Sequence, residues 1–272
     1  MTADTTTARS LACLEVWGGN CAVQEGLELP GLSAWVYSRP LHDAERGGDV
    51  YYLSACSHGL ITRIALADVS GHGQGVDGLA QTLRRLMNKY VNHWDQREFA
   101  EALNRAFRST QEQFQEQLDA LGLHGAIFAT CTILGYYCEE QQLLMTNAGH
   151  MPPLHYSAFE GAWRWLDEQA PFHRTKLTGL PLGLIPGTQY SQTGFQLGPQ
   201  DLLVLYTDGL LETVNESGEE LGSEGLMAIA RALPVRAPAD MGAAMLEAVQ
   251  RISEGGARAD DETLIVLRCD VS

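Results

Sequence analysis

Short runs rich in β-branched and aromatic residues follow one another in neighbouring pairs, and this pairing restricts the possible folds more than any other feature of the sequence. The runs DVYYLSACS (49–57) and ITRIALADV (61–69) are separated only by a turn that contains His58-Gly59. A second pair, AIFATCTILGYYCEE and QQLLMTNAG, turns near residues 139–142. Two such runs joined by a short turn are typical of a β-hairpin, so we expect antiparallel sheet.

Helical patterns lie between groups of strands and do not alternate with single strands. Apolar residues recur every three or four positions over 76–94 and over 99–121, which places them on one face of each helix. Asp95 is a suitable N-cap for the second helix, and Gly122 is a suitable end. This segregation favours a single α+β domain with largely antiparallel sheets over a Rossmann fold or a barrel. Further strands are predicted at 32–38, 154–157, 163–166, 193–197, 201–208 and 262–269, and further helices at 223–233 and 239–253.

The charge balance limits the partners that the chain is suited to bind. Its 272 residues carry 18 Lys and Arg against 34 Asp and Glu, a formal net charge of −16. Phosphate backbones and anionic membranes are bound mainly through basic side chains, so we expect neither nucleic acid nor a membrane surface as a partner. A bound metal ion still permits phosphate binding, because its charge reverses the local field.

The termini and the cysteines indicate the compartment. The first residues, MTADTTTARSLACLEVW, lack the basic and apolar regions of a signal peptide. The longest nearly apolar run, GAIFATCTILGYY, is too short to span a bilayer. No two of the six cysteines have a C-x-x-C spacing, which favours reduced thiols over a zinc site or a disulfide framework. We therefore predict a cytoplasmic protein with a partly disordered N-terminal segment, 1–30, and one folded domain over 31–272.

Four aspartate positions share one feature, because each lies at an end of a predicted strand. They are Asp49, Asp68, Asp208 and the pair Asp260-Asp261. Each has an ordinary explanation by itself, as a turn residue, a helix N-cap or a solvated strand end. If the strand ends meet at one rim, the carboxylates repel each other unless a cation lies between them. All-oxygen ligands select hard ions such as Mg²⁺ or Mn²⁺ over zinc.

The stretch ADVSGHGQGVDG (67–78) places four glycines directly after Asp68. Glycine takes positive φ readily, at an entropic cost that proteins accept where the chain turns sharply or a ligand comes close. Two interpretations therefore stand: a flexible turn between strand and helix, or a ligand-binding loop with Asp68 as a metal ligand or acid–base group.

Six short motifs occur in one order along the chain: GGDVYY (47–52), ADVSGHG (67–73), TNAGHMPPL (146–154), LPLGL (180–184), LLVLYTDGLLE (202–212) and DDETLIVLR (260–268). Together they resemble the metal-dependent protein serine/threonine phosphatases of the PPM family, in particular the bacterial SpoIIE/RsbU-like branch. The resemblance covers residues 30–270. It implies a four-layer α-β-β-α sandwich, in which two mainly antiparallel sheets are flanked by helices.

The resemblance also implies a metal centre that holds two Mn²⁺ or Mg²⁺ ions at one end of the sandwich. In this interpretation Asp68 holds both metals, and the glycines bring the Val69 carbonyl against a cation. One residue departs from the pattern: the branch commonly has a second aspartate three residues after the first, where this chain has Tyr52. The positions that match the family's metal ligands are Asp49, Asp68, the backbone carbonyl of Val69, Asp208 and Asp260.

The implied reaction is hydrolysis of a phosphoserine or phosphothreonine ester, in which two metals activate a water molecule and Asp68 belongs to the catalytic machinery. The leaving alkoxide needs a proton. His72 is the candidate general acid, with a backbone-bonded loop histidine as the alternative. His150 has a similar alternative, as a brace for the loop before Pro152-Pro153. His150 and His155 are separated by two prolines, which excludes a helical two-histidine zinc site.

The branch usually acts on a phosphorylated anti-sigma-factor antagonist, a small STAS-domain protein, and so the resemblance implies that substrate and a role in partner switching. Regulation by a partner, by homodimerisation or by the segment around Leu11–Trp17 is left open. Two rival functions also stand. The first is another phosphoesterase, such as a two-metal nuclease or a small-molecule phosphatase; the acidic balance disfavours the nuclease. The second is a non-catalytic phosphoprotein-binding module with a degenerate phosphatase fold, which Tyr52 keeps open.

Overall fold

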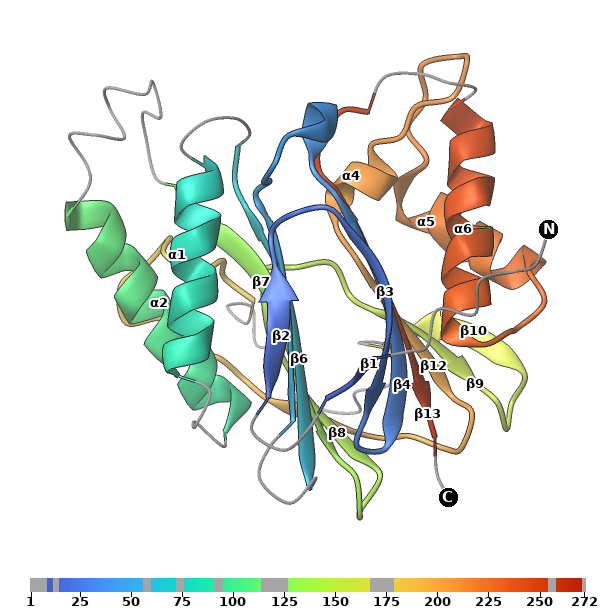
Figure 1. The fold of residues 1–272 in the computed structure, drawn as a ribbon, viewed down its shortest axis with the longest axis horizontal. Helices are drawn as coiled ribbons and strands as arrows, with labels where there is room; N and C mark the ends of the chain where they lie inside the picture. Colours follow the sequence, from blue (N-terminus) through green and yellow to red (C-terminus); the bar gives the residue numbers. More distant parts are fainter. Residues whose placement is uncertain are drawn as a thin grey trace.

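Two β-sheets stack face to face and carry helices on both outer faces, as Figure 1 shows for this computed structural model. The structure describes residues 9–11, 15–55, 60–71, 76–90, 95–113, 127–166, 179–253 and 258–270. Within these ranges every strand pairing is antiparallel except that of β1 with β3.

The six-stranded sheet has the order β11-β8-β7-β6-β5-β2. Its centre consists of the two hairpins that the sequence predicts, because β5 pairs with β6 and β7 pairs with β8. Its strands are β2 (Val16–Gly19), β5 (Asp49–Ala55), β6 (Ile61–Val69), β7 (Ala129–Tyr137), β8 (Gln142–Ala148) and β11 (Thr193–Gln196).

The seven-stranded sheet has the order β1-β3-β4-β13-β12-β9-β10. The last strand along the chain, β13, lies at its centre between β4 and β12. This sheet is therefore complete only when strands from both ends of the chain have paired. Its strands are β1 (Arg9–Ser10), β3 (Val23–Leu29), β4 (Leu32–Arg39), β9 (Leu154–Ser157), β10 (Ala162–Trp165), β12 (Leu202–Tyr206) and β13 (Glu262–Cys269).

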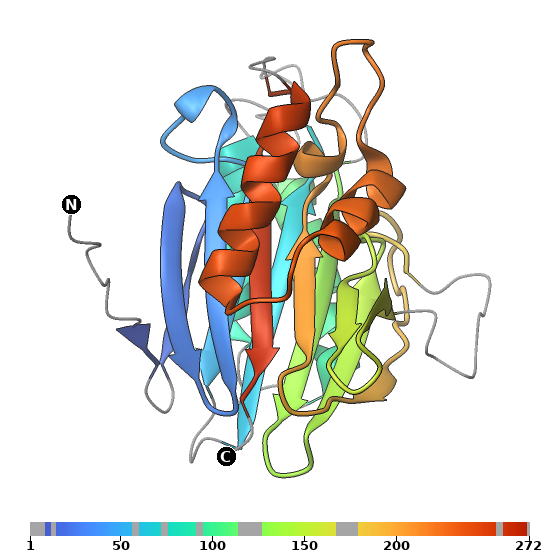
Figure 2. The same ribbon diagram turned by 90° about the vertical axis from the view of Figure 1, so that its right-hand side faces the viewer.

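The helices cover the two outer faces. Helices α1 (Val76–Lys89) and α2 (Gln96–Gln113) cover the six-stranded sheet, whereas α5 (Gly222–Ala232) and α6 (Pro238–Ser253) cover the seven-stranded one (Figures 1 and 2). Asp95 precedes α2, and its Oδ1 accepts a hydrogen bond from the Arg97 amide at 2.8 Å, which is the N-cap geometry that the sequence predicts. The short helices η1 (Leu41–Asp43) and α4 (Asp208–Leu211) lie at the same end of the sandwich (Figure 1).

Successive side chains of each strand point to opposite faces of its sheet, and this alternation divides the apolar core into three clusters. Leu53, Ile64 and Leu66 point between the sheets, where they meet residues such as Leu205 and Ile265 of the opposite sheet. The residues of odd and even number in one strand therefore belong to different layers. The outer face of the six-stranded sheet packs on α1 and α2, and that of the seven-stranded sheet on α5 and α6.

The α+β four-layer fold is confirmed, and two details differ from the expectation. The strands β2 and β3 lie before residue 31 and are paired into both sheets. The run 201–208 does not end at Asp208, because β12 ends at Tyr206 and Asp208 begins α4. No helix in the described ranges is long and apolar enough to cross a bilayer. The predicted turn at His58-Gly59 and the helix end at Gly122 lie outside the described residues.

Candidate metal centre

Asp49 and Asp68 lie directly across from each other in the β5–β6 pair. Residues opposed in an antiparallel pair have Cα atoms roughly 4.5–5.5 Å apart and side chains on one face. The same face carries Tyr51, Leu53 and Leu66, which point between the sheets. The hairpin therefore presents two carboxylates toward the seven-stranded sheet, although like charges in directly opposed positions are destabilising.

The seven-stranded sheet meets this pair through the segment that follows β12. The Thr207 hydroxyl donates to Asp49 Oδ2 at 2.8 Å and accepts from the Thr263 amide at 2.9 Å. Thr207 is fully buried, so it links the two sheets beside the carboxylates. Asp208 follows at once, and a Cβ built on Gly209 would overlap the Asp261 carbonyl. Gly209 thus permits the close approach that brings Asp208 next to the 260–261 segment.

Asp260 and Asp261 have different surroundings. Asp261 accepts hydrogen bonds from the backbone amides of Leu41, at 2.6 Å, and Gly48, at 2.5 Å. Its carboxylate is buried against Gly47, where no Cβ would fit. Asp261 therefore fixes the loop before Asp49 and has both oxygens engaged there. This role of Asp261 is not predictable from its local sequence; the glycine pair that precedes Asp49 is the one signal of a close contact there.

The carboxylates of these segments interact electrostatically. The pKa of Asp68 is raised to about 8, first by burial and then by the negative charges of Asp208, Asp260, Asp261 and Glu212. The pKa of Asp49 is also raised, by burial and then by Asp68. The pKa of Asp208 is raised too, mainly by burial. The structure thus brings the four predicted ligand aspartates to one end of the sandwich, where they disfavour each other's ionised form.

Glu212 belongs to the same acidic group, although the sequence analysis did not name it. It caps the end of α4, four residues after Asp208, and its amide donates to the Asp208 carbonyl at 2.9 Å. Burial is the main cause that raises the pKa of Glu212, and the negative charges of Asp208, Asp260 and Glu220 raise it further. The i,i+4 spacing from Asp208 was the available signal, because such residues share one side of a helical turn.

The donor set fits a hard divalent cation. All of the converging side chains are carboxylates. Asp49 is only 3% exposed, and its carboxylate is hydrogen-bonded by the described side chains of Thr207 and Thr263, neither of which is basic. Within the described ranges, no three His, Cys, Asp or Glu side chains are grouped closely enough to hold an ion as they stand. Mutual repulsion disfavours a closer grouping of ionised carboxylates, and a cation between them would offset that repulsion.

The turn after β6 is held from both sides. The Val69 amide donates to the Gly48 carbonyl at 3.3 Å, and the Ser70 amide donates to the Phe128 carbonyl at 2.9 Å. Gly71 has φ +95°, and among the described residues a Cβ there would lie 3.5 Å from the Val76 side chain. The positive φ of Gly71 is a backbone conformation that favours glycine at this position. His72 and Gly73 lie outside the described residues.

Tyr52 lies on the opposite face of β5 from Asp49. Its ring is fully buried in the cluster beneath the helices, with its centroid 6.5 Å from that of Phe99 in α2. It is paired with Ala65, three residues along the hairpin from the Asp49–Asp68 pair. Tyr52 is therefore a core residue of the helix-facing layer and does not border the carboxylates.

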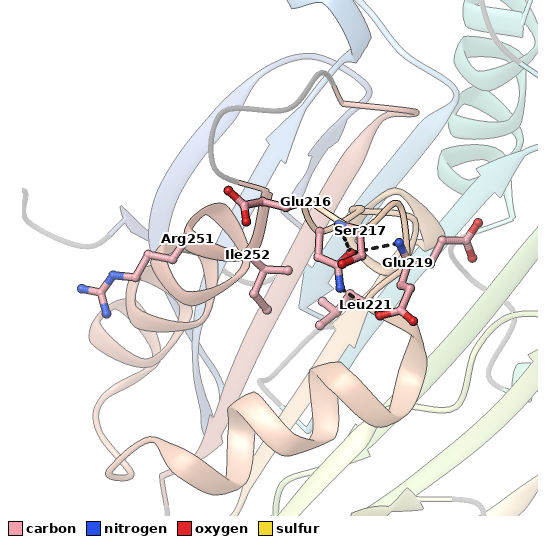
Figure 3. A pocket seen from close by; sticks show the side chains of 8 residues that line it. Glu216, Ser217, Glu219, Leu221, Arg251 and Ile252 are labelled. Atoms are coloured by element: carbon pink, nitrogen blue, oxygen red, sulfur yellow. Dashed lines mark hydrogen bonds between the residues drawn. The ribbon is translucent and has the colours of Figure 1, made fainter.

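A separate open pocket of about 550 Å³ lies beside α6 (Figure 3). The turn from Asn215 to Leu221 forms one wall, and Arg251 extends away from Glu219 toward its own partner, Glu247. None of its lining side chains is a buried polar group without a partner. We assign the candidate chemistry to the aspartate centre.

Solved structures of other proteins share this fold. A structure of the RsbU and RsbW domains of Rv1364c from Mycobacterium tuberculosis has a TM-score of 0.70 and 22% identity, covering 93% of this chain and 64% of that one. The PP2C phosphatase domain with a regulatory fragment of SpoIIE from Bacillus subtilis has a TM-score of 0.68 and 17% identity, covering 87% and 63%. The architecture is thus that of the PP2C-type phosphatases.

Sequence comparison gives the family. The family described as Stage II sporulation protein E (SpoIIE) matches residues 61–270, and the chain belongs to it. The phosphoserine phosphatase RsbU of Bacillus subtilis (strain 168) is 25% identical over 174 residues, which are 64% of this chain. The match spans 45% of the length of that relative.

Proposed function

We propose that this protein is a metal-dependent phosphatase that hydrolyses phosphoserine or phosphothreonine on a regulatory protein. The observation that carries the proposal is the convergence of aspartates from both sheets at one buried end, with the pKa of Asp68 raised to about 8. Such a cluster is costly without a function that uses its charge. Membership of the SpoIIE family and the similarity to a phosphoserine phosphatase support the same reaction.

The proposed ligands are Asp49, Asp68, Asp208, Asp260 and the Val69 carbonyl, and the proposed cofactors are two Mn²⁺ or Mg²⁺ ions. The catalytic domain of the serine/threonine protein phosphatase PstP, a structure in complex with two manganese ions, supports this choice; it has a TM-score of 0.55 and 15% identity and covers 88% of this chain and 99% of that one. Bound ions would supply Lewis acidity toward water and offset the charge on the phosphoryl oxygens.

The chain's own residues orient these ligands. Thr207 holds Asp49 by a hydrogen bond to Oδ2, and Asp261 fixes the preceding glycines by two backbone hydrogen bonds. Both contacts restrict the Asp49 carboxylate to the face between the sheets, which is the preorganisation that phosphoryl transfer requires. His72 remains the proposed donor of the proton to the leaving alkoxide.

The proposed substrate is a phosphorylated STAS-type anti-sigma-factor antagonist, in a partner-switching pathway of the cytoplasm. Support comes from the family and from a structural neighbour in which an RsbU domain and an RsbW domain occur in one protein. A net charge of −16 favours a protein partner over nucleic acid.

Turnover of p-nitrophenyl phosphate, and then of a phosphoserine-bearing STAS protein, tests the proposal. We expect hydrolysis with Mn²⁺ or Mg²⁺, none with EDTA, and a loss of at least 100-fold in Asp208→Asn, because one proposed ligand is removed. Asp240→Asn is the matched control, since this carboxylate is exposed in the first turn of α6, and it should retain full activity. Hydrolysis that survives EDTA and Asp208→Asn alike would exclude the metal-dependent reaction.

The alternative function is a non-catalytic phosphoprotein-binding module, which the sequence analysis left open because of Tyr52. The position of Tyr52 in the helix-facing core removes the specific reason for that alternative. Binding of the phosphorylated STAS protein, with no phosphate release in the presence of either metal, would favour the module over the enzyme.

A further inference from the structure

His150 lies in the tight turn between β8 and β9, and its orientation is fixed by Asn147. The Asn147 side chain accepts from the His150 amide at 2.8 Å and donates to the His150 carbonyl at 2.9 Å. Gly149 between them has φ +73°, and a Cβ there would overlap Pro181. The turn thus directs the imidazole inward, where it is 7% exposed.

Both ring nitrogens have partners, and these partners define the tautomer. Nε2 lies 3.1 Å from the Tyr206 carbonyl, and Nδ1 lies 2.8 Å from the Thr130 hydroxyl. A carbonyl only accepts, so Nε2 carries the proton. Burial lowers the pKa of His150 to about 4, so the ring is neutral at pH 7 and Nδ1 accepts from Thr130. With both nitrogens engaged, His150 is not free to act as a general acid.

The two partners belong to different sheets. Thr130 lies in β7, directly across from Asp68 in the β6–β7 pair. Tyr206 ends β12 in the seven-stranded sheet, and Asp208 follows two residues later. Figure 1 shows β7 and β12 in separate layers. One imidazole therefore joins the strand that neighbours Asp68 to the strand that leads into Asp208.

We propose that His150 is a positioning residue that locks the two sheets together at the candidate metal centre and sets the separation between Asp68 and Asp208. The inference rests on the proposed function for the identity of the metal ligands. The carboxylates repel each other across the interface, and the hydrogen bonds of His150 to β7 and β12 oppose that repulsion together with the Thr207 contact to Asp49. We call the hydrogen bonds of His150 to Thr130 and Tyr206 the His150 lock. It keeps the proposed ligands in position for the cation, as residues that hydrogen-bond near metal ligands generally do.

Two substitutions of His150 distinguish the effect of its two hydrogen bonds from the effect of its packing. In His150→Leu the Tyr206 carbonyl and the Thr130 hydroxyl lose their partner. In His150→Gln an amide group replaces the ring, and it can donate to the carbonyl and accept from the hydroxyl. We expect Mn²⁺ affinity, measured by calorimetry, to fall about 10- to 100-fold in His150→Leu and by less than about threefold in His150→Gln.

His155→Leu is the matched control. His155 is also buried, in β9, and its Nε2 lies 3.0 Å from Asp201 Oδ2, at the start of β12 and away from Asp208. Its loss should destabilise the fold without changing Mn²⁺ affinity. If His150→Leu binds Mn²⁺ as tightly as the wild type, or if both leucine variants lose affinity equally, the proposal is overturned.

Hydrogen–deuterium exchange on the metal-free protein gives a readout that depends on neither metal nor activity. We expect His150→Leu to speed exchange in peptides that cover the start of β7 and the end of β12 together, and His155→Leu to affect only the opposite end of β12. Unchanged exchange in both strands would overturn the lock. Wild-type protein that binds Mn²⁺ but hydrolyses no phosphoester would refute the proposed function and leave the lock intact.

Discussion

Asp260 and Asp261 are adjacent carboxylates, and their surroundings give them different effects on stability. Asp261 is buried and accepts two backbone hydrogen bonds, so Asp261→Asn replaces one acceptor by an amide that faces an N–H donor. We expect this variant to lose about 1–3 kcal/mol in free energy of unfolding, with or without metal. Asp260→Asn removes a repulsive charge, so the metal-free protein should keep its stability while the proposed metal site is lost.

Urea unfolding of both variants, with Mn²⁺ and with EDTA, measures these effects. Equal losses in the two variants without metal would contradict the division of roles. The contrast is specific because the residues are neighbours of the same type, so differences in size and composition do not contribute.

His150 gives a pH dependence whose sign follows from its lowered pKa. The unfolded chain binds a proton at this residue below about pH 6.5, whereas the folded protein does so only near pH 4. Between these values the unfolded state holds more protons, so the stability that His150 contributes is lost as the pH falls. At about 1.4 kcal/mol per pKa unit, the difference amounts to roughly 3 kcal/mol.

Urea unfolding of the wild type and His150→Gln from pH 7 to pH 4 tests this prediction. We expect the stability advantage of the wild type to shrink steadily over that range, because glutamine does not titrate. A constant difference between the two proteins would show that His150 keeps the same protonation state in the folded and unfolded chains.

At the residue scale, the sequence predicted which carboxylates gather but not what orders them. The positions of Asp49 and Asp68 followed from strand ends, and register then places them opposite each other. The roles of Asp261 and His150 depend on partners 213 and 56 residues away in sequence, at Gly48 and Tyr206. No local pattern encodes such contacts, because they exist only once the sheets have stacked.

Two helical glycines give the same substitution opposite effects. In α6, a Cβ on Gly242 would overlap the indole ring of Trp35, which is buried in β4. We expect Gly242→Ala to cost about 1–3 kcal/mol, because the helix must move off the sheet. In α1, Gly78 is exposed and no described atom lies within 4 Å of its Cβ position, so Gly78→Ala should gain up to about 1 kcal/mol in helix propensity.

Thermal unfolding of these two alanine variants measures the effect of helix packing directly. A gain in both would mean that α6 adjusts without cost, and a loss in both would mean that Gly78 is constrained by something other than its helix.

At the scale of elements, periodicity predicted the long helices and the central hairpins, whereas the missed elements lacked a periodic signal. The run VQEGLEL forms β3, but it mixes charges with a glycine because parts of the strand face solvent. β2 is VWGG, in which Gly18 packs against the Tyr51 carbonyl. α4 has only four residues, fewer than a helical pattern requires.

At the scale of the whole molecule, the carboxylates oppose the stacking that the apolar cluster between the sheets favours. Asp49 is contributed by the six-stranded sheet and held by Thr207, which follows β12 of the other, so its charge is buried in the interface itself. Removing that charge should therefore affect both sheets together. The topology has the same consequence, since β13 pairs with both β4 and β12 and joins the two ends of the chain.

Asp49→Asn should accordingly stabilise the metal-free protein and abolish its response to metal. At pH 8 we expect a gain of about 1–2 kcal/mol over the wild type in EDTA, because a buried carboxylate facing Asp68 becomes a neutral amide. With Mn²⁺ at 100 times its dissociation constant, the wild type should gain about 2.7 kcal/mol, and the variant nothing. Asp240→Asn should respond to Mn²⁺ as the wild type does. If Asp49→Asn is less stable than the wild type in EDTA, the Asp49 carboxylate is a net structural support, and repulsion between the sheets does not limit the stability of the metal-free fold.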